Sequence, residues 1–385
     1  MKMGENILQH FHPDIQPLIK VVLSEKVGIG SGNIKISGIS SGRPTDSAEG
    51  NADRFKLVIP YAGQKITWNV VFNSQKPHFA PDFCFDEDSF LADPDIEFLE
   101  ESLPSLAAWN VRDPRALLNV ISELLEIYRK HQVELLEHAD RSRLHFEYSS
   151  LICQAEVAEG DVEVLVGSGR QRASSFLIRL QVDFSAIPQP LGNTGEPTAT
   201  LTVTFHSPTE GGRITPQLLL SLQAEAALEG VGGSGMSLPP FPPGGSCLMD
   251  YVPLVTARLQ DRIDAAAAAH DRRRELITAL FHHFGNSVLE YDGICFTRAS
   301  FLLEWRDFYF ILHFTLPPGF PREKPVVMFQ SVYHATDGKP YRYRFEDFPY
   351  NPRTEVKKMA EKLIATVIEY VEVFQKNSIQ SSLNL

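Results

Sequence analysis

The chain has 385 residues and a formal net charge of −12, with 43% hydrophobic and 22% charged residues. At ~100–200 residues per domain, this length predicts two or three domains, and the ordinary composition argues against long disordered regions. The acidic balance disfavours a protein that mainly grips nucleic-acid phosphates, because such binding depends on clustered Lys and Arg. We therefore expect no nucleic-acid partner.

The cysteines and the apolar runs exclude further classes. No two of the four cysteines form a CxxC pair, which argues against a zinc site. A secreted disulfide framework is also not expected, because a chain of this size can fold without one. The first eight residues lack the apolar core of a signal peptide, and no apolar run reaches the ~20 residues that span a bilayer. We expect no metal, cofactor or membrane partner, and a location in the cytoplasm and the nucleus.

The first section of the chain reads as a helix followed by an antiparallel meander. Apolar residues at helical spacing cover residues 5–24, and a Pro-bounded flap covers residues 76–81. Residues 40–52 are polar and rich in Gly and Ser, which predicts a loop. Because no helix separates the strands, we predict a meander rather than a doubly wound sheet. The predicted strands are residues 34–39, 55–61, 66–72 and 82–85.

A second helix is predicted to close this section. The acidic residues 86–101 are loop-like, with room for one helical turn. Asp113 and Pro114 then open a strong helix as N-cap and first residue, and the helix is predicted to end near His138. Its apolar face consists of Leu117, Leu118, Ile121, Leu124, Leu125 and Tyr128.

The middle section begins with strands again. The Gly/Pro-rich residues 229–246 are the clearest linker-like segment, and a long helix is predicted over residues 251–284. The strands are predicted over residues 144–157, 162–166, 175–184 and 198–206, with a further one over residues 218–222.

The last section repeats the order of the first. A Pro-bounded flap covers residues 317–325, a helix is predicted over residues 354–375, and the aromatic-rich residues 341–350 lie in a predicted loop. Aromatic side chains in a loop either close the domain's own core or anchor an interface. The predicted strands are residues 287–291, 296–305, 308–316 and 326–330. The candidate partner-binding residues are Phe320, Tyr333, Tyr341, Tyr343, Phe348 and Tyr350.

This order of elements resembles the ubiquitin-conjugating-enzyme (E2) fold, its inactive E2-variant (UEV) form and the related RWD domain. The likeness is strongest at Phe320-Pro321 with Pro325, which is similar to the family's Pro-rich flap. Residues 329–334 resemble its fourth strand and Tyr-His box, and Trp109-Asn110 with Pro114 is similar to its Trp-Ser-Pro sequence.

The resemblance predicts an α+β protein built from tandem UEV/RWD-like domains, with antiparallel meander sheets flanked by helices. Shared helices are expected to connect the domains. The expected boundaries are residues 1–138 for the N-terminal domain, 139–275 for the middle domain and 276–385 for the C-terminal domain.

Short strings over nearly the whole chain are similar to the BRE family of E2-variant proteins. The strings are residues 53–57, 59–63, 81–83, 250–253, 329–334 and 350–353. This resemblance implies a non-catalytic scaffold of the BRISC deubiquitylase, which cleaves ubiquitin chains linked through lysine sixty-three, and of its nuclear sister complex. The implied partners are a metalloprotease-type deubiquitylase, its pseudo-protease partner and a von Willebrand A-domain subunit. A serine hydroxymethyltransferase is implied for the cytosolic form, and direct ubiquitin binding is left open.

The residues that E2 catalysis requires are missing. That chemistry needs a cysteine shortly after the fourth strand and an Asn side chain that stabilises the oxyanion. No cysteine follows Cys295, and residues 86–108 contain neither Cys nor His. Cys84 falls inside a predicted strand, where it is a packing residue or a strand-face residue, since a free Cys is usually a small buried hydrophobe. We therefore expect no catalytic residue and no enzyme activity of the chain itself.

Two other functions stay open at this point. An E2-variant cofactor would orient ubiquitin for an active E2, but it needs one E2-like domain where this chain has two or three. An unrelated hydrolase would need a catalytic constellation, and the metalloprotease signature HExxH does not occur. Adjacent residues on a helix point about 100° apart, so His282-His283 cannot form an i, i+4 metal pair.

Overall fold

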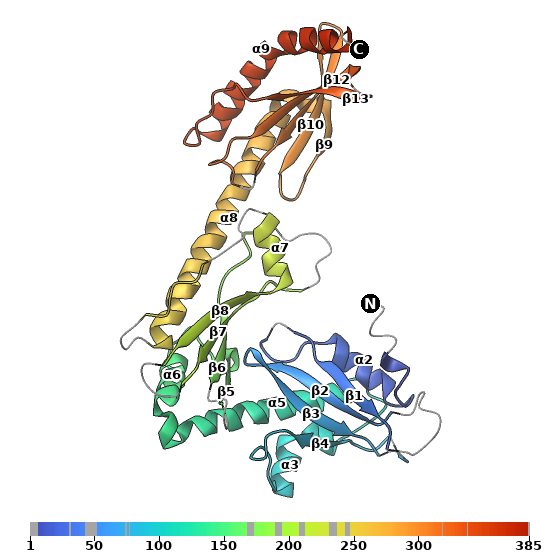
Figure 1. The fold of residues 1–385 in the computed structure, drawn as a ribbon, viewed down its shortest axis with the longest axis vertical. Coiled ribbons are helices and arrows are strands. Elements are labelled where there is room, and N and C mark those ends of the chain that lie inside the picture. The colour runs from blue at the N-terminus through green and yellow to red at the C-terminus, as the bar shows by residue number, and fades with distance from the viewer. Residues whose placement is uncertain are drawn as a thin grey trace. The chain divides into compact units, whose positions relative to one another are not determined.

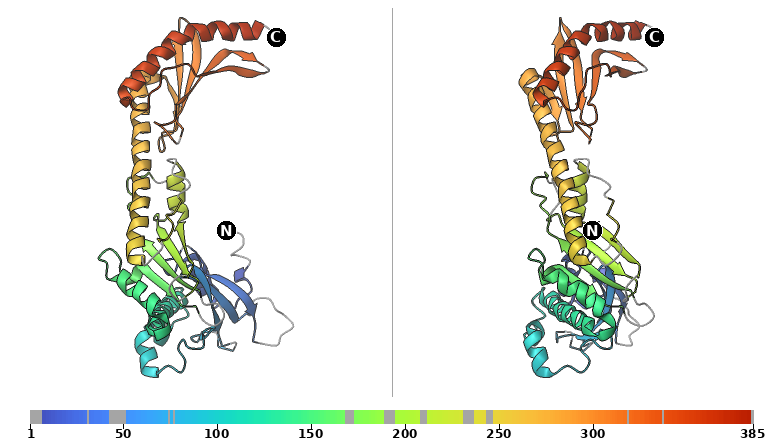
Figure 2. Two further views of the ribbon diagram at one scale, coloured as in Figure 1. Left: turned by 60° about the vertical axis from the view of Figure 1, so that its left-hand side comes forward. Right: turned by 90° about the vertical axis from the view of Figure 1, so that its left-hand side faces the viewer.

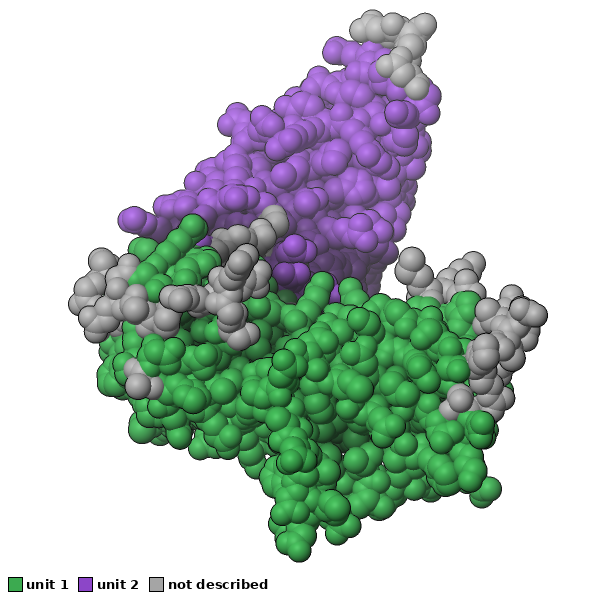
Figure 3. Space-filling view, turned by 60° about the horizontal axis from the view of Figure 1, so that its bottom comes forward, with its two compact units in different colours: residues 1–181, 198–220, 238–256 green, residues 182–197, 221–237, 257–385 purple. Residues whose placement is uncertain are grey.

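The computed structural model describes most of the chain as two compact units (Figure 3). Unit 1 comprises residues 1–181, 198–220 and 238–256, and unit 2 comprises residues 182–197, 221–237 and 257–385. The described residues are 7–30, 32–42, 52–73, 75–76, 78–167, 173–188, 195–207, 212–230, 237–242, 247–317, 319–336 and 338–383. Within them the fold is α+β with three antiparallel sheets, which confirms the predicted class. No helix of this described part is long and apolar enough to cross a membrane.

The first sheet, in unit 1, is the predicted meander in the order β1-β2-β3-β4 (Figure 1). In β2, alternate residues such as Phe55, Leu57 and Ile59 are buried, which is the pattern of a sheet with one covered face. The helices α2 (Gln16–Ser24) and α5 (Ala116–Glu134) share a core with these strands. The strands are β1 (Lys35–Ser40), β2 (Arg54–Tyr61), β3 (Gln64–Val71) and β4 (Asp82–Phe85).

The segment between β4 and α5 contains more helix than predicted. Two short helices, α3 (Ile96–Ser102) and α4 (Pro104–Ala107), occupy part of the acidic stretch and the residues after it. The predicted cap of α5 was wrong by two residues. Asp113 accepts a hydrogen bond from the N–H of Arg115 at 3.0 Å in a turn before the helix, and Arg115 is the N-cap residue.

The second sheet, also in unit 1, has the order β5-β6-β7-β8. The strand predicted over residues 144–157 was wrong, because α6 (Ser142–Ile152) buries Leu144, Tyr148 and Leu151 at helical spacing. A further helix, α7 (Leu222–Gly230), follows the last strand and belongs to unit 2. Most of the predicted loop 40–52 and linker 229–246 lies outside the described residues. The strands are β5 (Val162–Leu165), β6 (Ser174–Leu180), β7 (Ala199–Phe205) and β8 (Ile214–Leu220).

Unit 2 contains the third sheet, in the order β13-β12-β11-β10-β9. The helix α8 (Leu248–Phe284) belongs to unit 2 from residue 257, and its end shares a core with the sheet and with α9 (Val356–Leu383) (Figure 2). The loop predicted over residues 341–350 was wrong in its first half, which forms a strand. The strands are β9 (Val288–Tyr291), β10 (Arg298–Trp305), β11 (Phe308–Thr315), β12 (Val326–Thr336) and β13 (Lys339–Phe345).

The three-domain boundaries stay a prediction. Unit 1 contains the sheets of the predicted N-terminal and middle domains, and unit 2 contains the sheet of the predicted C-terminal domain. The first two sheets therefore belong to one compact body.

Candidate partner-binding site

Three of the six predicted partner-binding residues help to close the core of unit 2. Phe320 and Phe348 are 1% and 6% exposed. The Lys324 ammonium lies 3.9 Å from the centre of the Phe348 ring. The hydroxyl of the half-buried Tyr350 donates to the carbonyl oxygens of Pro321 and Glu323. These hydrogen bonds hold the Pro-bounded flap (residues 317–325) in place. This placement favours the core interpretation for all three side chains.

Two more candidates, Tyr341 and Tyr343, lie on β13 and pack against α9. Tyr341 stacks on Phe374 with ring centres 5.8 Å apart, and Tyr343 stacks on Tyr370 at 5.2 Å. The arginines between and after them are exposed on the other face of the strand. Both tyrosines are half-buried, so their main contact is with the domain's own helix. Their binding of a partner stays a prediction.

Tyr333 is the one candidate of the six with a largely exposed side chain, at 56%. Val332 beside it is 51% exposed, and Tyr309 on the neighbouring strand β11 is 39% exposed. A hydrogen bond to Glu304 raises the pKa of Tyr309, and the nearby Tyr333 raises it further. The Tyr333 ring also lies 5.8 Å from the ring of the buried Phe308. We name the three exposed side chains Tyr309, Val332 and Tyr333 the Tyr333 patch. Large side chains that combine apolar area with a hydroxyl are typical interface anchors.

The cysteines do not have the surroundings of an activated nucleophile. Cys84 is exposed on the open face of β4, while Phe83 and Phe85 beside it turn toward the core. Burial raises the pKa of the Cys247 and Cys295 thiols, which keeps both protonated at neutral pH. Since the thiolate is the nucleophile, this shift lowers their reactivity.

Ser300 and His313 form the arrangement closest to a catalytic pair, on the sheet of unit 2. The Ser300 Oγ lies 2.8 Å from the imidazole Nδ1, but the other ring nitrogen faces the Gln330 amide oxygen at 3.3 Å. An imidazolium would need a carboxylate there, and the nearest one, Glu290, lies on the serine side at 3.3 Å. Burial also lowers the pKa of His313. These contacts form a hydrogen-bonded row across the sheet rather than a nucleophile with its base.

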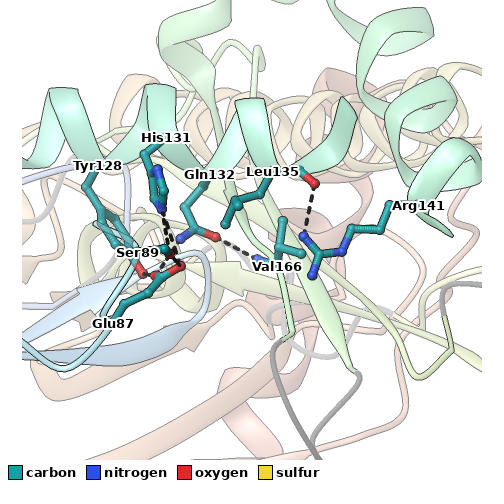
Figure 4. Close-up of polar contacts among 8 residues, drawn as sticks. All are labelled: Glu87, Ser89, Tyr128, His131, Gln132, Leu135, Arg141 and Val166. Atoms are coloured by element: carbon teal, nitrogen blue, oxygen red, sulfur yellow. Dashed lines mark hydrogen bonds and ion pairs between the residues drawn. The ribbon is translucent and has the colours of Figure 1, made fainter. Parts of the chain in front are cut away.

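A buried polar network joins α5 to both sheets of unit 1 (Figure 4). The Tyr128 hydroxyl and the Gln132 amide both donate to Glu87 Oε2, at 2.9 and 2.8 Å. The Gln132 carbonyl oxygen accepts the N–H of Val166, just after β5, at 2.9 Å. Burial, followed by the charge of Glu87, raises the pKa of Tyr128, so the phenol keeps the proton that it donates. Gln132 thus bridges the loop after β4 and the end of β5.

A buried carboxylate makes the second connection between the same two sheets. Glu163 on β5 is 4% exposed, and its two oxygens accept the N–H groups of Ile29 at 2.9 Å and Ala62 at 2.8 Å. Burial raises its pKa, and these two hydrogen bonds lower it. The turn that contains Ala62 needs Gly63, because its φ is +75° and a Cβ there would lie 2.6 Å from the Thr202 methyl. We name the contacts of Gln132 and Glu163 together the polar joint.

The sequence carries a weak signal for the polar joint, which is not among the predicted sites. Gln132 follows Tyr128 by four residues, so it lies on the apolar stripe of α5, where a polar side chain needs a partner. Glu163 is a charged residue inside an apolar strand. Both positions indicate a buried hydrogen bond, but neither identifies its partner.

The described residues therefore define an α+β protein whose distinctive features are exposed side-chain patches and a buried joint. The sequence model of the family described as "Brain and reproductive organ-expressed protein (BRE)" matches residues 9–335. A curated relative from Branchiostoma floridae, named "BRISC and BRCA1-A complex member 2", is 42% identical over 393 residues and covers 99% of this chain and 100% of its own. A relative of the same name from Danio rerio is 36% identical, covering 97% of each chain. The chain belongs to the BRE family.

Glu163→Gln is expected to destabilise unit 1. The amide retains one acceptor oxygen and leaves one of the two backbone N–H groups facing an NH₂ group, a loss of about 1–3 kcal/mol in the free energy of unfolding. Urea unfolding measures the change. Glu156→Gln, at an exposed position, is the matched control and should stay within about 0.5 kcal/mol. Equal effects of the two substitutions would contradict the joint.

Tyr343→Ala and Tyr333→Ala should differ in their effect on stability. Tyr343 loses its stacking on α9, so we expect a cost of about 1–3 kcal/mol, whereas the exposed Tyr333 should cost about 0.5 kcal/mol or less. Thermal and urea unfolding of the full chain test both values. A large loss of stability from Tyr333→Ala would place this residue with the core aromatics.

Proposed function

We propose that the chain is a non-catalytic scaffold subunit of a deubiquitylase complex. The observation that carries this proposal is the similarity over nearly the full chain to two relatives whose names make them members of the BRISC and BRCA1-A complexes. Because 97–99% of this chain aligns with these relatives, each segment that they use for assembly has a counterpart here.

The polar joint supports a scaffold role in physical terms. A scaffold has to hold its binding surfaces at a constant separation, and buried hydrogen bonds fix orientation more strongly than an apolar contact does. Gln132 and Glu163 make such bonds between the first sheet, α5 and the second sheet. Unit 1 can therefore present surfaces of both sheets as one body.

The finer part of the proposal follows the sequence resemblance. The complex would cleave ubiquitin chains linked through lysine sixty-three. The chain would bridge the metalloprotease and pseudo-protease pair to the von Willebrand A-domain subunit, in the cytoplasm and the nucleus. Ubiquitin and a serine hydroxymethyltransferase are further candidates for binding.

The test is purification of the tagged full chain from its own cells, followed by mass spectrometry and a cleavage assay. We expect a metalloprotease-type deubiquitylase to co-elute with it, and we expect the eluate to cleave lysine-sixty-three chains in preference to lysine-forty-eight chains. Depleting the chain should reduce the amount of assembled enzyme. Co-purification with an active E2, and no deubiquitylase, would favour the E2-variant cofactor instead.

Tyr333→Ala should weaken capture of one subunit without unfolding the chain. An exposed aromatic anchor contributes about 1–2 kcal/mol or more to an interface, so the affinity should fall about tenfold. Quantitative pull-down from cells that express each variant measures it, with Tyr291→Ala, similarly exposed at 52%, as the control. If the two variants capture every subunit equally, the Tyr333 patch does not anchor a partner.

The isolated chain should form no thioester with ubiquitin. Cys84 is exposed, but no side chain of the described residues hydrogen-bonds its thiol, as an activating base would. Incubation with activating enzyme, an active E2 and ATP, followed by a non-reducing gel, tests this. A ubiquitin adduct that is lost on reduction and absent from Cys84→Ser would overturn the non-catalytic assignment.

A further inference from the structure

A groove of about 690 Å³ in unit 1 runs between α3 and α5 and has an apolar floor. The floor consists of Phe90, Leu91, Phe98 and Ile127. Phe90 is buried, whereas Phe98 is 44% exposed and its ring lies open to solvent. On the α5 side the lining extends from Ser122 to Glu134, a distance of about 18 Å along a helix. The groove is therefore long enough for a helix of about three turns.

The helix α3, which forms one wall, buries none of its own residues. It starts at Asp95, whose side chain accepts the N–H of Glu97 at 3.3 Å, and it carries Ile96, Phe98 and Leu99. A short helix in water is marginal unless it packs an apolar face against something. Leu99 packs partly against the core of unit 1, whereas Phe98 is 44% exposed and lines the groove. Phe98 is thus available to another molecule.

The rim of the groove is acidic. Glu101, Glu123, Glu126 and Glu134 line it, and Lys130 is the one Lys or Arg among the lining residues. Glu123 binds Ser105 and Glu126 pairs with Arg129, but within the described part of the chain Glu101 and Glu134 have no ion pair. The preceding segment adds charge of the same sign, because residues 86–101 contain eight Asp and Glu and no Lys or Arg.

We propose that this acidic groove is the docking site for a basic amphipathic helix of another protein. Apolar side chains of that helix, three and four residues apart, would fill the floor between Phe98 and Ile127. Its Lys and Arg side chains would meet Glu101 and Glu134 at the rim, where opposite charge raises the association rate and selects the partner. The proposal rests on the scaffold role for the source of this helix, which is a segment of a co-assembling subunit.

The charge of the rim decides between this occupant and others. Nucleic acid and the anionic surface of a cytoplasmic membrane would both be repelled by the rim carboxylates. A second copy of this chain that met the groove with its own groove would place two acidic rims against each other. A basic helix satisfies both the apolar floor and the acidic rim.

Binding of a synthetic peptide to the full chain tests the chemistry of the groove. The probe is a peptide of about 14 residues with Leu at helical spacing and Lys at the other positions, compared with a scrambled peptide of the same composition. We expect Phe98→Ala and Glu101→Lys each to weaken binding of the amphipathic peptide at least about tenfold. The amphipathic peptide should bind more tightly than the scrambled one, and its affinity should fall as salt is raised.

Two substitutions on the same helix are the matched controls. Ile96 is 72% exposed and Glu100 is exposed, and neither lines the groove. Ile96→Ala and Glu100→Lys should leave the affinity within about twofold. If all charge reversals act alike and Phe98→Ala has no effect, the peptide binds through diffuse charge and the proposal is overturned. A dimer of the chain that Phe98→Ala dissociates would overturn it as well, because the occupant would then be a second copy.

Photo-crosslinking in the purified complex identifies the source of the helix. A photoreactive phenylalanine at position 98 should crosslink to a segment of a co-purifying subunit that is net basic and has apolar residues at helical spacing. The same residue at position 96 should not yield that product. If the complex assembles but position 98 captures no such segment, the docking proposal fails and the scaffold role stands. If no deubiquitylase complex is recovered, the scaffold role itself fails.

Discussion

A carboxylate removed from water has to find hydrogen-bond donors, and Glu163 finds them across the boundary between two sheets. Its oxygens accept N–H groups from the segment after α2 and from the β2–β3 turn, 134 and 101 residues away along the chain. An apolar side chain could fill the same space, but it would tolerate a sliding contact. The carboxylate does not, because a small displacement leaves a buried charge or a buried N–H without a partner. The relative position of the two sheets therefore depends on this contact.

Gln132 extends the same constraint to α5. One side of its amide donates to Glu87 and the other accepts from Val166, so the helix is fixed to the loop after β4 and to the end of β5 together. Because α5 also forms one wall of the acidic groove, the polar joint and the groove share a helix. A ligand in the groove would contact an element that both sheets hold in place.

Most strands and the long helices were predictable because their periodicity is strong. The failures have particular causes. In residues 142–152, Leu144, Phe146 and Tyr148 alternate like a strand, yet Phe146 is 57% exposed and Glu147 is buried, with its carboxylate accepting the N–H of Leu248. In β13, tyrosine and arginine alternate as they do in a strand with one covered face. The aromatic residues alone resemble an exposed loop, because the helix α9 that covers them comes later in the chain. Long-range partners of this kind cannot be read from local pattern.

In the candidate site, too, the residue types could be read from the sequence, whereas the burial of each side chain could not. The sequence groups six aromatic residues as partner-binding candidates, but pattern could not separate Phe320, which is 1% exposed, from Tyr333, which is 56% exposed. The acidic stretch before α5 was read as a loop, since charge hides the helical spacing of Ile96, Phe98 and Leu99. Among them, Phe98 is 44% exposed beside the groove, on a helix with no buried residue. Such exposure distinguishes a surface from a core, because a core must be covered by its own chain. Placement, more than residue type, thus separates the exposed Phe98 and Tyr333 from the aromatic residues that close the fold.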